Sequence, residues 1–498
     1  MNNSFQRQFI DSGLLSRWIV LGVIILGIGR IWAGHVIPQG HGLGWDGELI
    51  YLTIIKEFPV ERHQISHFFI QRSLPFAIAH YAMQALGWPF LAKQIVLFFQ
   101  LFNLTLTLLS LLIWRWLADR VGLGTQGRLL GYVALAISFC NMLMPLYNPV
   151  LTDILAFFLS MLLLFFYLTG HVFSMFLVIA AGAFTWPTIL PIGAILFLFP
   201  KAESALIGNS APLTFQDKIT PRLLLLIGTV VIVTILFSHN FVPLQEHKRD
   251  LLEAGANVIV SISIFIYLYV SVPDLVVNCA RQFFYFIMDT NKRRLLARLF
   301  ILAAFFGGVK MFSNYWGHQN EHREFFGWYL FDIFVKNNGR PLLFILNHFL
   351  YFGPIVVVAG FLWRRVIIKA AGLGPGMALV AFFVVLQVID TQSRREIGNL
   401  PFIVLFTAMA FDEIGGGGKR FWMFFLLLSF LTTKLFVPFE LDFPTLFFTS
   451  GGRYMAFKWY VIQLCLMLPS AYFLWRLFHV DDASRQANVT NPAGRTQP

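Results

Sequence analysis

The residues best suited to chemistry follow the first apolar stretch of the chain. The segment from Gly42 to Tyr51 reads GLGWDGELIY, so a single glycine separates Asp46 from Glu48. Two carboxylates this close can present their oxygens to one point, which suits a general base, a divalent metal, or both. The alternative is an ordinary polar loop in which Asp46 caps a helix.

A third carboxylate, Asp153, comes one helical turn after Asn148-Pro149 and opens another apolar stretch. A carboxylate at the bilayer centre costs about 2.5–3.5 kcal/mol on insertion scales, so such a residue usually faces the bundle interior or water. We therefore treat Asp153 as a site candidate. The alternative is a helix-start charge that is solvated at the interface.

The segment from Asp390 to Glu396 reads DTQSRRE and precedes Asn399-Leu-Pro. Its two adjacent arginines, Arg394 and Arg395, are forked donors suited to phosphate. The alternative is a charge run on a wetted loop. A histidine, His348, lies near the outer end of another apolar stretch, where a hydrogen-bonded contact between helices is expected rather than a catalyst.

The composition places these candidates in a membrane protein. Of the 498 residues, 57% are hydrophobic and only 12% are charged, and the mean hydropathy is +0.70. A soluble domain keeps about a quarter of its residues charged, so this chain has too few charges to cover a water-facing surface. The net charge of +12 falls mostly in short loops between apolar stretches, which indicates membrane orientation rather than nucleic-acid binding.

Clusters of Lys and Arg set the orientation, because cytoplasmic loops hold the excess. We assign to the cytoplasm the basic clusters at 115–128, 201–222, 281–298, 364–369 and 419–420. This predicts an all-α bundle of about fourteen transmembrane helices with both termini in the cytoplasm. The predicted spans are 17–36, 92–115, 129–147, 150–169, 171–185, 187–200, 222–242, 257–278, 297–312, 341–363, 372–390, 400–413, 421–437 and 457–476.

Residues 37–91 form the first extracytoplasmic loop in this topology. The part from Gln64 to Gly87 is apolar but interrupted by Arg72, Pro75 and His80, so we expect surface helices rather than a span. All the candidates above then lie on the outer side. A basic pair there runs against the charge bias, which favours anion binding by Arg394 and Arg395.

The rest of the chain adds little chemistry. Residues 1–478 are expected to form a single transmembrane domain, and the polar segment 479–498 a disordered cytoplasmic tail. A break at Trp186-Pro187 is expected to divide 171–200 into two short spans. The three cysteines lack metal-site spacing and predict no disulfide.

Trp45-Asp46-Gly47-Glu48, followed by surface helices that carry Arg62 and Arg72, resembles the GT-C superfold of membrane glycosyltransferases. The likeness is greatest to bacterial members and to the mannosyltransferases of GPI-anchor assembly. Thr152-Asp153 and the arginine pair ahead of Asn399 also look like features of the bacterial relatives. The resemblance covers the first third of the chain and a stretch near Asp390. We expect no soluble C-terminal domain of the oligosaccharyltransferase kind, which puts a bulky polymer or protein acceptor in doubt.

The resemblance implies inverting transfer of a sugar from a polyprenyl-phosphate donor to a glycan or glycolipid acceptor, at the periplasmic face of the inner membrane. Its implied site has Asp46 as the catalytic base, Arg62, Arg72, Arg394 and Arg395 on the donor phosphate, and Glu48, Asp153, His63 and Asp390 in support. A divalent cation, Mg²⁺ or Mn²⁺, held by Asp46 and Glu48 is the one cofactor it leaves open. Membrane lipid is an expected partner, and nucleic acid is not.

Two other classes stay open. A lipid-linked sugar flippase or small-molecule transporter would place its polar residues near the bilayer midplane on discontinuous helices. Most charges here lie at one face, although Arg30, Lys310 and Lys434 need a location. A non-catalytic, polymerase or ligase component of envelope-polysaccharide assembly would have the same sequence appearance as a transferase.

Overall fold

The computed structural model describes residues 12–44, 50–186, 188–201, 292–318, 342–388, 390, 392–434, 455 and 457–490. This part of the chain is all-α and contains no strand beyond one isolated bridge. Its elements are α2 (Ser12–Ala33), η1 (Gln39–Gly42), α3 (Leu52–Glu57), α4 (His67–Ile70), α5 (Leu74–Ala85), α6 (Ala92–Arg120), α7 (Thr125–Ala136), η3 (Phe139–Leu143), α8 (Met144–Tyr147), α9 (Asp153–Thr169), α10 (Val172–Ala183), α11 (Ile189–Leu198), α15 (Lys292–Trp316), α17 (Leu343–Phe352), α18 (Ile355–Phe361), α19 (Trp363–Gly372), α20 (Pro375–Gln387), η7 (Ser393–Asn399), α21 (Leu400–Glu413), α22 (Lys419–Thr433) and α24 (Phe457–Thr490).

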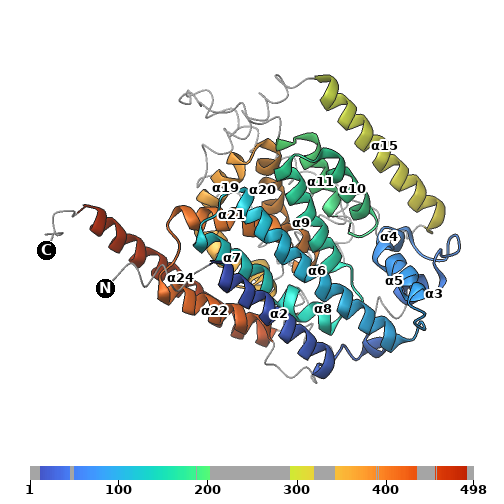
Figure 1. The fold of residues 1–498 in the computed structure, drawn as a ribbon, viewed down its shortest axis with the longest axis horizontal. Helices are drawn as coiled ribbons and strands as arrows, with labels where there is room; N and C mark the ends of the chain where they lie inside the picture. Colours follow the sequence, from blue (N-terminus) through green and yellow to red (C-terminus); the bar gives the residue numbers. More distant parts are fainter. Residues whose placement is uncertain are drawn as a thin grey trace, which may run out of the picture.

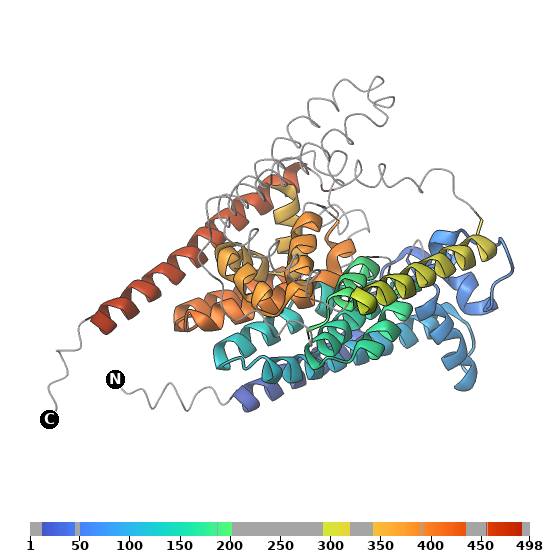
Figure 2. The same cartoon turned by 90° about the horizontal axis from the view of Figure 1, so that it is seen from above.

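The centre of the bundle is built by α6, α7, α9 and α21, which pack on one another (Figure 1). α10 and α11 pack as a pair beside α9, and α15 lies at the flank against α11 and α4. Figure 2 shows α2 beginning and α24 ending toward the same end of the molecule. The arrangement surrounds one large apolar core, as expected for helices that are hydrophobic over most of their surface.

Three described helices are long and apolar enough to cross a membrane: α6, the part of α15 from Arg293 to Trp316, and the part of α24 from Phe457 to Leu477. A bent pair, α7 with the turn and helix that follow it, makes a fourth if it is counted as one span. Shorter apolar helices lie within five further predicted spans, 150–169, 171–185, 187–200, 341–363 and 372–390. The chain therefore has the helices of a membrane protein. The count of fourteen stays a prediction, and the spans at 222–242 and 257–278 lie outside the described residues.

Two predicted spans are broken rather than continuous. The span 129–147 bends by 54° where Ile137 leaves the helical conformation and a π-helical turn, η3, begins. Asn141 supports this bend, because its Nδ2 donates to the carbonyl of Leu135 at 2.7 Å. The span 341–363 divides into α17 and α18 at Gly353-Pro354, where the glycine has φ 83° and the proline lacks a backbone donor.

The stretch 171–200 forms two helices, as predicted from Trp186-Pro187. The described residues between 37 and 91 likewise contain only short helical segments, η1, α3, α4 and α5, and none of the four is long enough to span. They surround a second apolar core, in which the rings of Tyr51 and Phe76 stack with centroids 3.9 Å apart. Short helices are thus present in this loop, and their position at the membrane surface stays a prediction.

Loops that were predicted to share the outer side contact one another. Backbone hydrogen bonds join the first outer loop to three other predicted outer segments: Ile37 to Tyr147, His63 to Trp316, Leu74 to Phe184, and Ile65 to His318. We call this the outer end of the bundle. The side-chain contacts of the candidate site, described below, lie at the same end.

The opposite ends of the helices also meet as predicted. Asp412, near the end of α21, accepts hydrogen bonds from the backbone N–H groups of Gly124 and Gly127 at the start of α7. A carboxylate there neutralises the positive end of the helix dipole. Lys369 and Glu413 form an ion pair at 3.2 Å. Among the described residues, this inner end carries Arg128, Lys369 and Lys419, from three of the basic clusters that the positive-inside rule assigns to the cytoplasm.

Cysteine labelling tests the orientation. In a protein whose native cysteines are replaced by serine, Gln64→Cys at the outer end is expected to react with an impermeant maleimide in intact cells. Lys419→Cys at the inner end is expected to react only after permeabilisation, because the charge bias places it in the cytoplasm. Both positions are exposed, whereas Ser393 of the predicted outer loop is buried and unsuitable. The reverse labelling pattern would invert the topology.

The C-terminal segment differs from its prediction. α24 continues to Thr490, so residues 479–490 are helical instead of belonging to a disordered tail. No proline or glycine lies between residues 479 and 490, and the helix ends before Asn491-Pro492, where proline disfavours helix in the residue before it. Residues 491–498 lie outside the described part.

Candidate functional site

Two candidates from distant parts of the sequence form an ion pair at the outer end. Asp153 is the first residue of α9, and its side chain is only 5% exposed. Arg394 in η7 donates from Nε to both carboxylate oxygens of Asp153, at 2.9 and 2.7 Å. A carboxylate in the first turn of a helix is also stabilised by the helix dipole. The structure therefore gives Asp153 a defined partner in place of solvent.

Trp186 supplies the surface on which the arginines gather. Its buried indole donates from Nε1 to the carbonyl of Arg395 at 3.1 Å, which fixes the ring against η7. The guanidinium carbon of Arg72 lies 4.2 Å from the ring centroid, and that of Arg394 lies 5.8 Å from it. Cation–π attraction to tryptophan helps to hold both arginines at this place.

Arg72 connects the first outer loop to this group. It lies between α4 and α5, with its guanidinium carbon 4.0 Å from the ring centroid of Phe68 and its head group beside the hydroxyl of Tyr51. Burial lowers the pKa of Arg72, Tyr51 opposes that shift, and the charge of Arg394 lowers the pKa further. Arginine nevertheless stays protonated in proteins. We call Arg72, Asp153, Trp186 and Arg394 the arginine cluster.

The arginine cluster has an excess of positive charge. Two guanidinium groups face one carboxylate, and the buried Nε of Arg72 has no hydrogen-bond partner within the described ranges. Forked guanidinium donors on a fixed aromatic ring are suited to bind the oxygens of a phosphate. The geometry can therefore hold an anion at the outer end of the bundle.

Arg395 has a different role from its neighbour. It donates from Nη1 to Oδ2 of Asp390 at 3.2 Å, and the side chain of Asp390 is fully buried. The other oxygen of Asp390 accepts from the backbone N–H of Gln392 at 2.9 Å. This pair closes the loop between α20 and η7 on itself. Adjacent arginines thus serve two separate carboxylates.

His348 supports the same loop from α17. Its Nε2 donates to the carbonyl of Val388 at 2.7 Å, and Nδ1 accepts from the hydroxyl of Ser393 at 3.0 Å. Both ring nitrogens are therefore used to connect α17 with the loop that carries Arg394. The prediction of a hydrogen-bonded contact is confirmed.

Arg62 and His63 are not brought to the arginine cluster. Arg62 donates from Nε to the carbonyl of Tyr315 at 3.0 Å and stacks on the Tyr315 ring at 4.0 Å. His63 donates from Nδ1 to the carbonyl of Gly317 at 3.1 Å. Both residues fasten the first outer loop to the end of α15. These contacts explain the position of the Arg62 side chain without a role in binding phosphate.

Asp46 and Glu48 lie outside the described residues. Of the described residues on either side of them, one lies beside the arginine cluster and the other beside the loop that precedes Asp153. A Cβ on Gly44 would lie 2.8 Å from Oδ1 of Asn148, in the loop that leads to Asp153, and Tyr51 lies beside Arg72. In the part of the chain that the structure describes, no three His, Cys, Asp or Glu side chains gather as a metal site.

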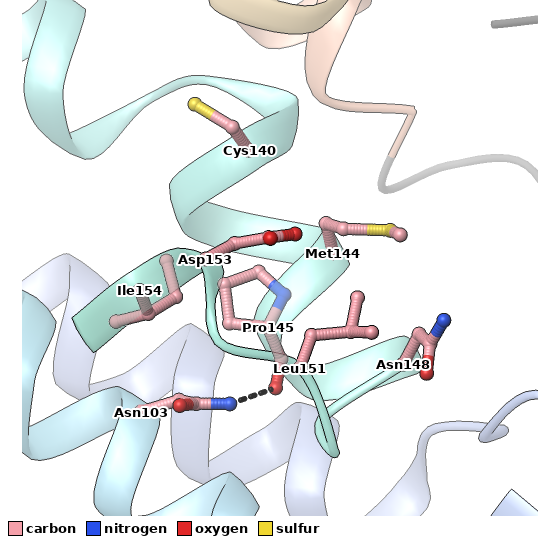
Figure 3. Close-up of a pocket in the computed structure, with 8 residues that line it drawn as sticks. All are labelled: Asn103, Cys140, Met144, Pro145, Asn148, Leu151, Asp153 and Ile154. Atoms are coloured by element: carbon pink, nitrogen blue, oxygen red, sulfur yellow. Dashed lines mark hydrogen bonds between the residues drawn. The ribbon is translucent and has the colours of Figure 1, made fainter. Parts of the chain in front are cut away.

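A small cavity lies on the Asp153 side of this region (Figure 3). Its free volume of about 10 Å³ has room for one water molecule. It is lined by Asn103, Cys140, Met144, Pro145, Asn148, Leu151, Asp153 and Ile154. Asn103 donates to the carbonyls of Pro145 and Pro149 at 3.0 Å each, which holds the wall of the cavity in place.

Glu396 is a buried carboxyl group beside the second ion pair. It is 3% exposed, and one oxygen accepts from Nδ2 of Asn399, whereas Oε1 has no partner among the described residues. Burial raises the pKa of Glu396 well above its usual range, and the charge of Asp390 raises it further, against the opposing effect of Arg395. The group is therefore protonated well above the pH at which an exposed glutamate ionises.

This pKa predicts a pH-dependent stability. Between the ordinary pKa of about 4.3 and the raised pKa, the folded chain binds more protons than the unfolded chain, so stability falls as pH rises through that window. We expect Glu396→Gln to unfold at a temperature that varies less between pH 5 and pH 9 than that of the parent protein, measured in detergent. Glu61→Gln, at an exposed position, is the matched control and should follow the parent. An unchanged slope for Glu396→Gln would contradict the assignment.

Three contributors were not singled out from the sequence: Tyr51, Phe68 and Trp186. Tyr51 closes the loop that contains both carboxylates, and Trp186 was noted only as part of a helix break. An aromatic residue at a break between two short apolar helices is a signal that could have been used. The arginines that contact Trp186, however, come from segments more than a hundred residues away in the sequence.

No protein-family model and no curated protein matches the chain.

Proposed function

We propose that the chain is a membrane glycosyltransferase of the GT-C type, which moves a sugar from a polyprenyl-phosphate donor to a glycan or glycolipid acceptor. The observation that carries this proposal is the arginine cluster, in which Arg72 and Arg394 meet on Trp186 and Arg394 binds Asp153. A net positive, partly enclosed site at one end of an apolar bundle suits a phosphate joined to a lipid tail. By the charge bias, this end faces away from the cytoplasm.

The reaction is a single displacement with inversion. Asp46 takes the proton of an acceptor hydroxyl while the acceptor oxygen forms a bond to the anomeric carbon of the sugar. The bond between that carbon and the phosphate oxygen breaks, and its electron pair leaves with the polyprenyl phosphate. Arg72 and Arg394 stabilise the negative charge on the departing phosphate. Asp153 holds Arg394 in position through both of its oxygens.

Asp46 and Glu48 are also the pair that would hold Mg²⁺ or Mn²⁺, because carboxylates are the ligands these ions prefer. Such an ion would add positive charge near the phosphate. The support for Asp46 as base is its separation by one residue from Gly44, which borders the loop leading to Asp153. The proposed location is the inner membrane, with the reaction at its periplasmic face.

A lipid-linked sugar flippase is the second candidate. The breaks at Ile137 and at Gly353-Pro354 favour it, since discontinuous helices near the midplane are a feature of transporters. The third candidate is a component of polysaccharide assembly that is non-catalytic or acts as a polymerase or ligase. Such a protein would have the same fold but would not catalyse this transfer.

One assay separates these candidates. Purified protein in vesicles is given a radiolabelled polyprenyl-phosphate sugar together with a membrane extract as acceptor, and label is followed in water-soluble and lipid fractions. Transfer of the sugar to a new acceptor with release of polyprenyl phosphate supports the transferase. Movement of intact donor between leaflets without transfer would support the flippase. The absence of both transfer and movement would favour an assembly component.

A further inference from the structure

The bend between α7 and α8 brings side chains from two other helices to the middle of the bundle. Phe139 begins the π-helical turn at the bend, and its ring is buried. Tyr351 of α17 lies edge-on to this ring, with centroids 5.6 Å apart. Lys434, directly after α22, has its ammonium 4.9 Å from the centroid of the same ring. Turns of this kind are often found at functional sites.

Lys434 is an unusual residue for this position. It has φ 57°, a left-handed conformation uncommon for a side chain other than asparagine, aspartate or histidine. Its Nζ is buried and makes no hydrogen bond to any described residue. Attraction to the face of Phe139 offsets only part of the cost of removing an ammonium from water. A buried cation of this kind needs an anionic partner.

Tyr351 offers a second donor nearby. Its hydroxyl is buried and has no hydrogen-bond partner within the described segments. The same side chain lies within electrostatic range of Asp153, Cys140 and Arg394. Tyr351 and Lys434 therefore contact the same ring, that of Phe139, from two different helices.

We propose that Lys434 and Tyr351 bind a phosphate group inside the bundle, at a second anion site separate from the arginine cluster. The ammonium supplies the charge, and the hydroxyl supplies a directed hydrogen bond. The surrounding rings are apolar, which suits a phosphate carried by a lipid, although the same donors also bind free phosphate. This site goes beyond the proposed transfer reaction and does not depend on it.

Lipid binding by the purified full-length protein tests the proposal. Native mass spectrometry in detergent follows a titration with dioleoyl phosphatidic acid, and thermal unfolding follows a titration with inorganic phosphate. Lys434→Met is expected to weaken one saturable site by about tenfold or more, and Tyr351→Phe by about threefold. Lys434→Arg, which keeps the charge, should retain most of the affinity.

Two controls locate the effect. Lys310→Met removes an exposed lysine of α15 and should leave binding unchanged, and Arg72→Met should leave the Lys434 site occupied. Saturation by inorganic phosphate would identify the free ion as a ligand, whereas saturation by phosphatidic acid alone would identify a lipid headgroup. Equal affinity of the parent, Lys434→Met and Tyr351→Phe proteins would overturn the proposal. If Lys434→Met does not fold, Tyr351→Phe decides, because phenylalanine keeps the packing on Phe139.

Discussion

Replacing Asp46 with asparagine is expected to lower the rate of sugar transfer by about 10²–10⁴-fold. Asparagine keeps the size and shape of the side chain but cannot accept the proton of the acceptor hydroxyl. Asp46 also has a flanking tryptophan, a following glycine and a second carboxylate two residues on, which suits a base presented on a turn. The measurement is transfer from a radiolabelled polyprenyl-phosphate sugar, together with complementation of a deletion strain.

Glu48→Gln is the matched control for this substitution. It should reduce transfer less than Asp46→Asn if Glu48 only orients the base or helps to hold a metal. Added Mn²⁺ or Mg²⁺ would then restore part of the rate. Binding of the donor should survive in Asp46→Asn, because the arginine cluster is intact. Full transfer by the Asp46→Asn protein would remove the enzyme assignment and favour the flippase or assembly roles.

Substituting lysine for Arg394 is expected to reduce transfer by about 10- to 100-fold, although the charge is kept. Arg394 binds Asp153 with a guanidinium that also faces Trp186, and a planar fork can bind a phosphate through two parallel donors. Lysine would replace this fork with a single mobile ammonium. The loss should appear in transfer rate and in affinity for polyprenyl phosphate.

Arg395→Lys is a control that the chain itself offers, since the two arginines are adjacent. Arg395 binds the buried Asp390 instead. Its replacement should therefore lower the unfolding temperature of the protein, and it should reduce the transfer rate less than Arg394→Lys does. Equal losses of transfer for both substitutions would contradict the division of roles. Equal full activity of both would indicate that the loop is only a solvated charge run.

The composition and the apolar stretches of the chain were enough to predict a helical membrane protein, because lipid requires every backbone polar group to be satisfied within a helix. Interruptions by proline and by charge likewise predicted the short helices of 37–91 and the divided stretch at Trp186-Pro187. The breaks at Ile137 and Gly353 escaped prediction. Apolar residues continue through both, and hydropathy does not register a local change of backbone conformation.

The sequence also marked Arg72, Asp153, Arg394 and Asp390 as individual candidates, because charges are rare in this chain. Which of them meet was decided by the tertiary structure. Asp153 and Arg394 are 241 positions apart, and local patterns contain no information on contacts across that separation.

The difference between Arg62 and Arg72 shows the same limit. Both lie in the first outer loop within ten residues of each other, and the sequence assigned them one role. Packing of that loop against the end of α15 directs Arg62 to Tyr315, whereas packing against the break after α10 directs Arg72 to Trp186. The residue types determined which side chains could bind a phosphate, and only the meeting of distant loops determined which of them are placed to do so. The physical reason is that a guanidinium takes its role from the rings and carboxylates that surround it.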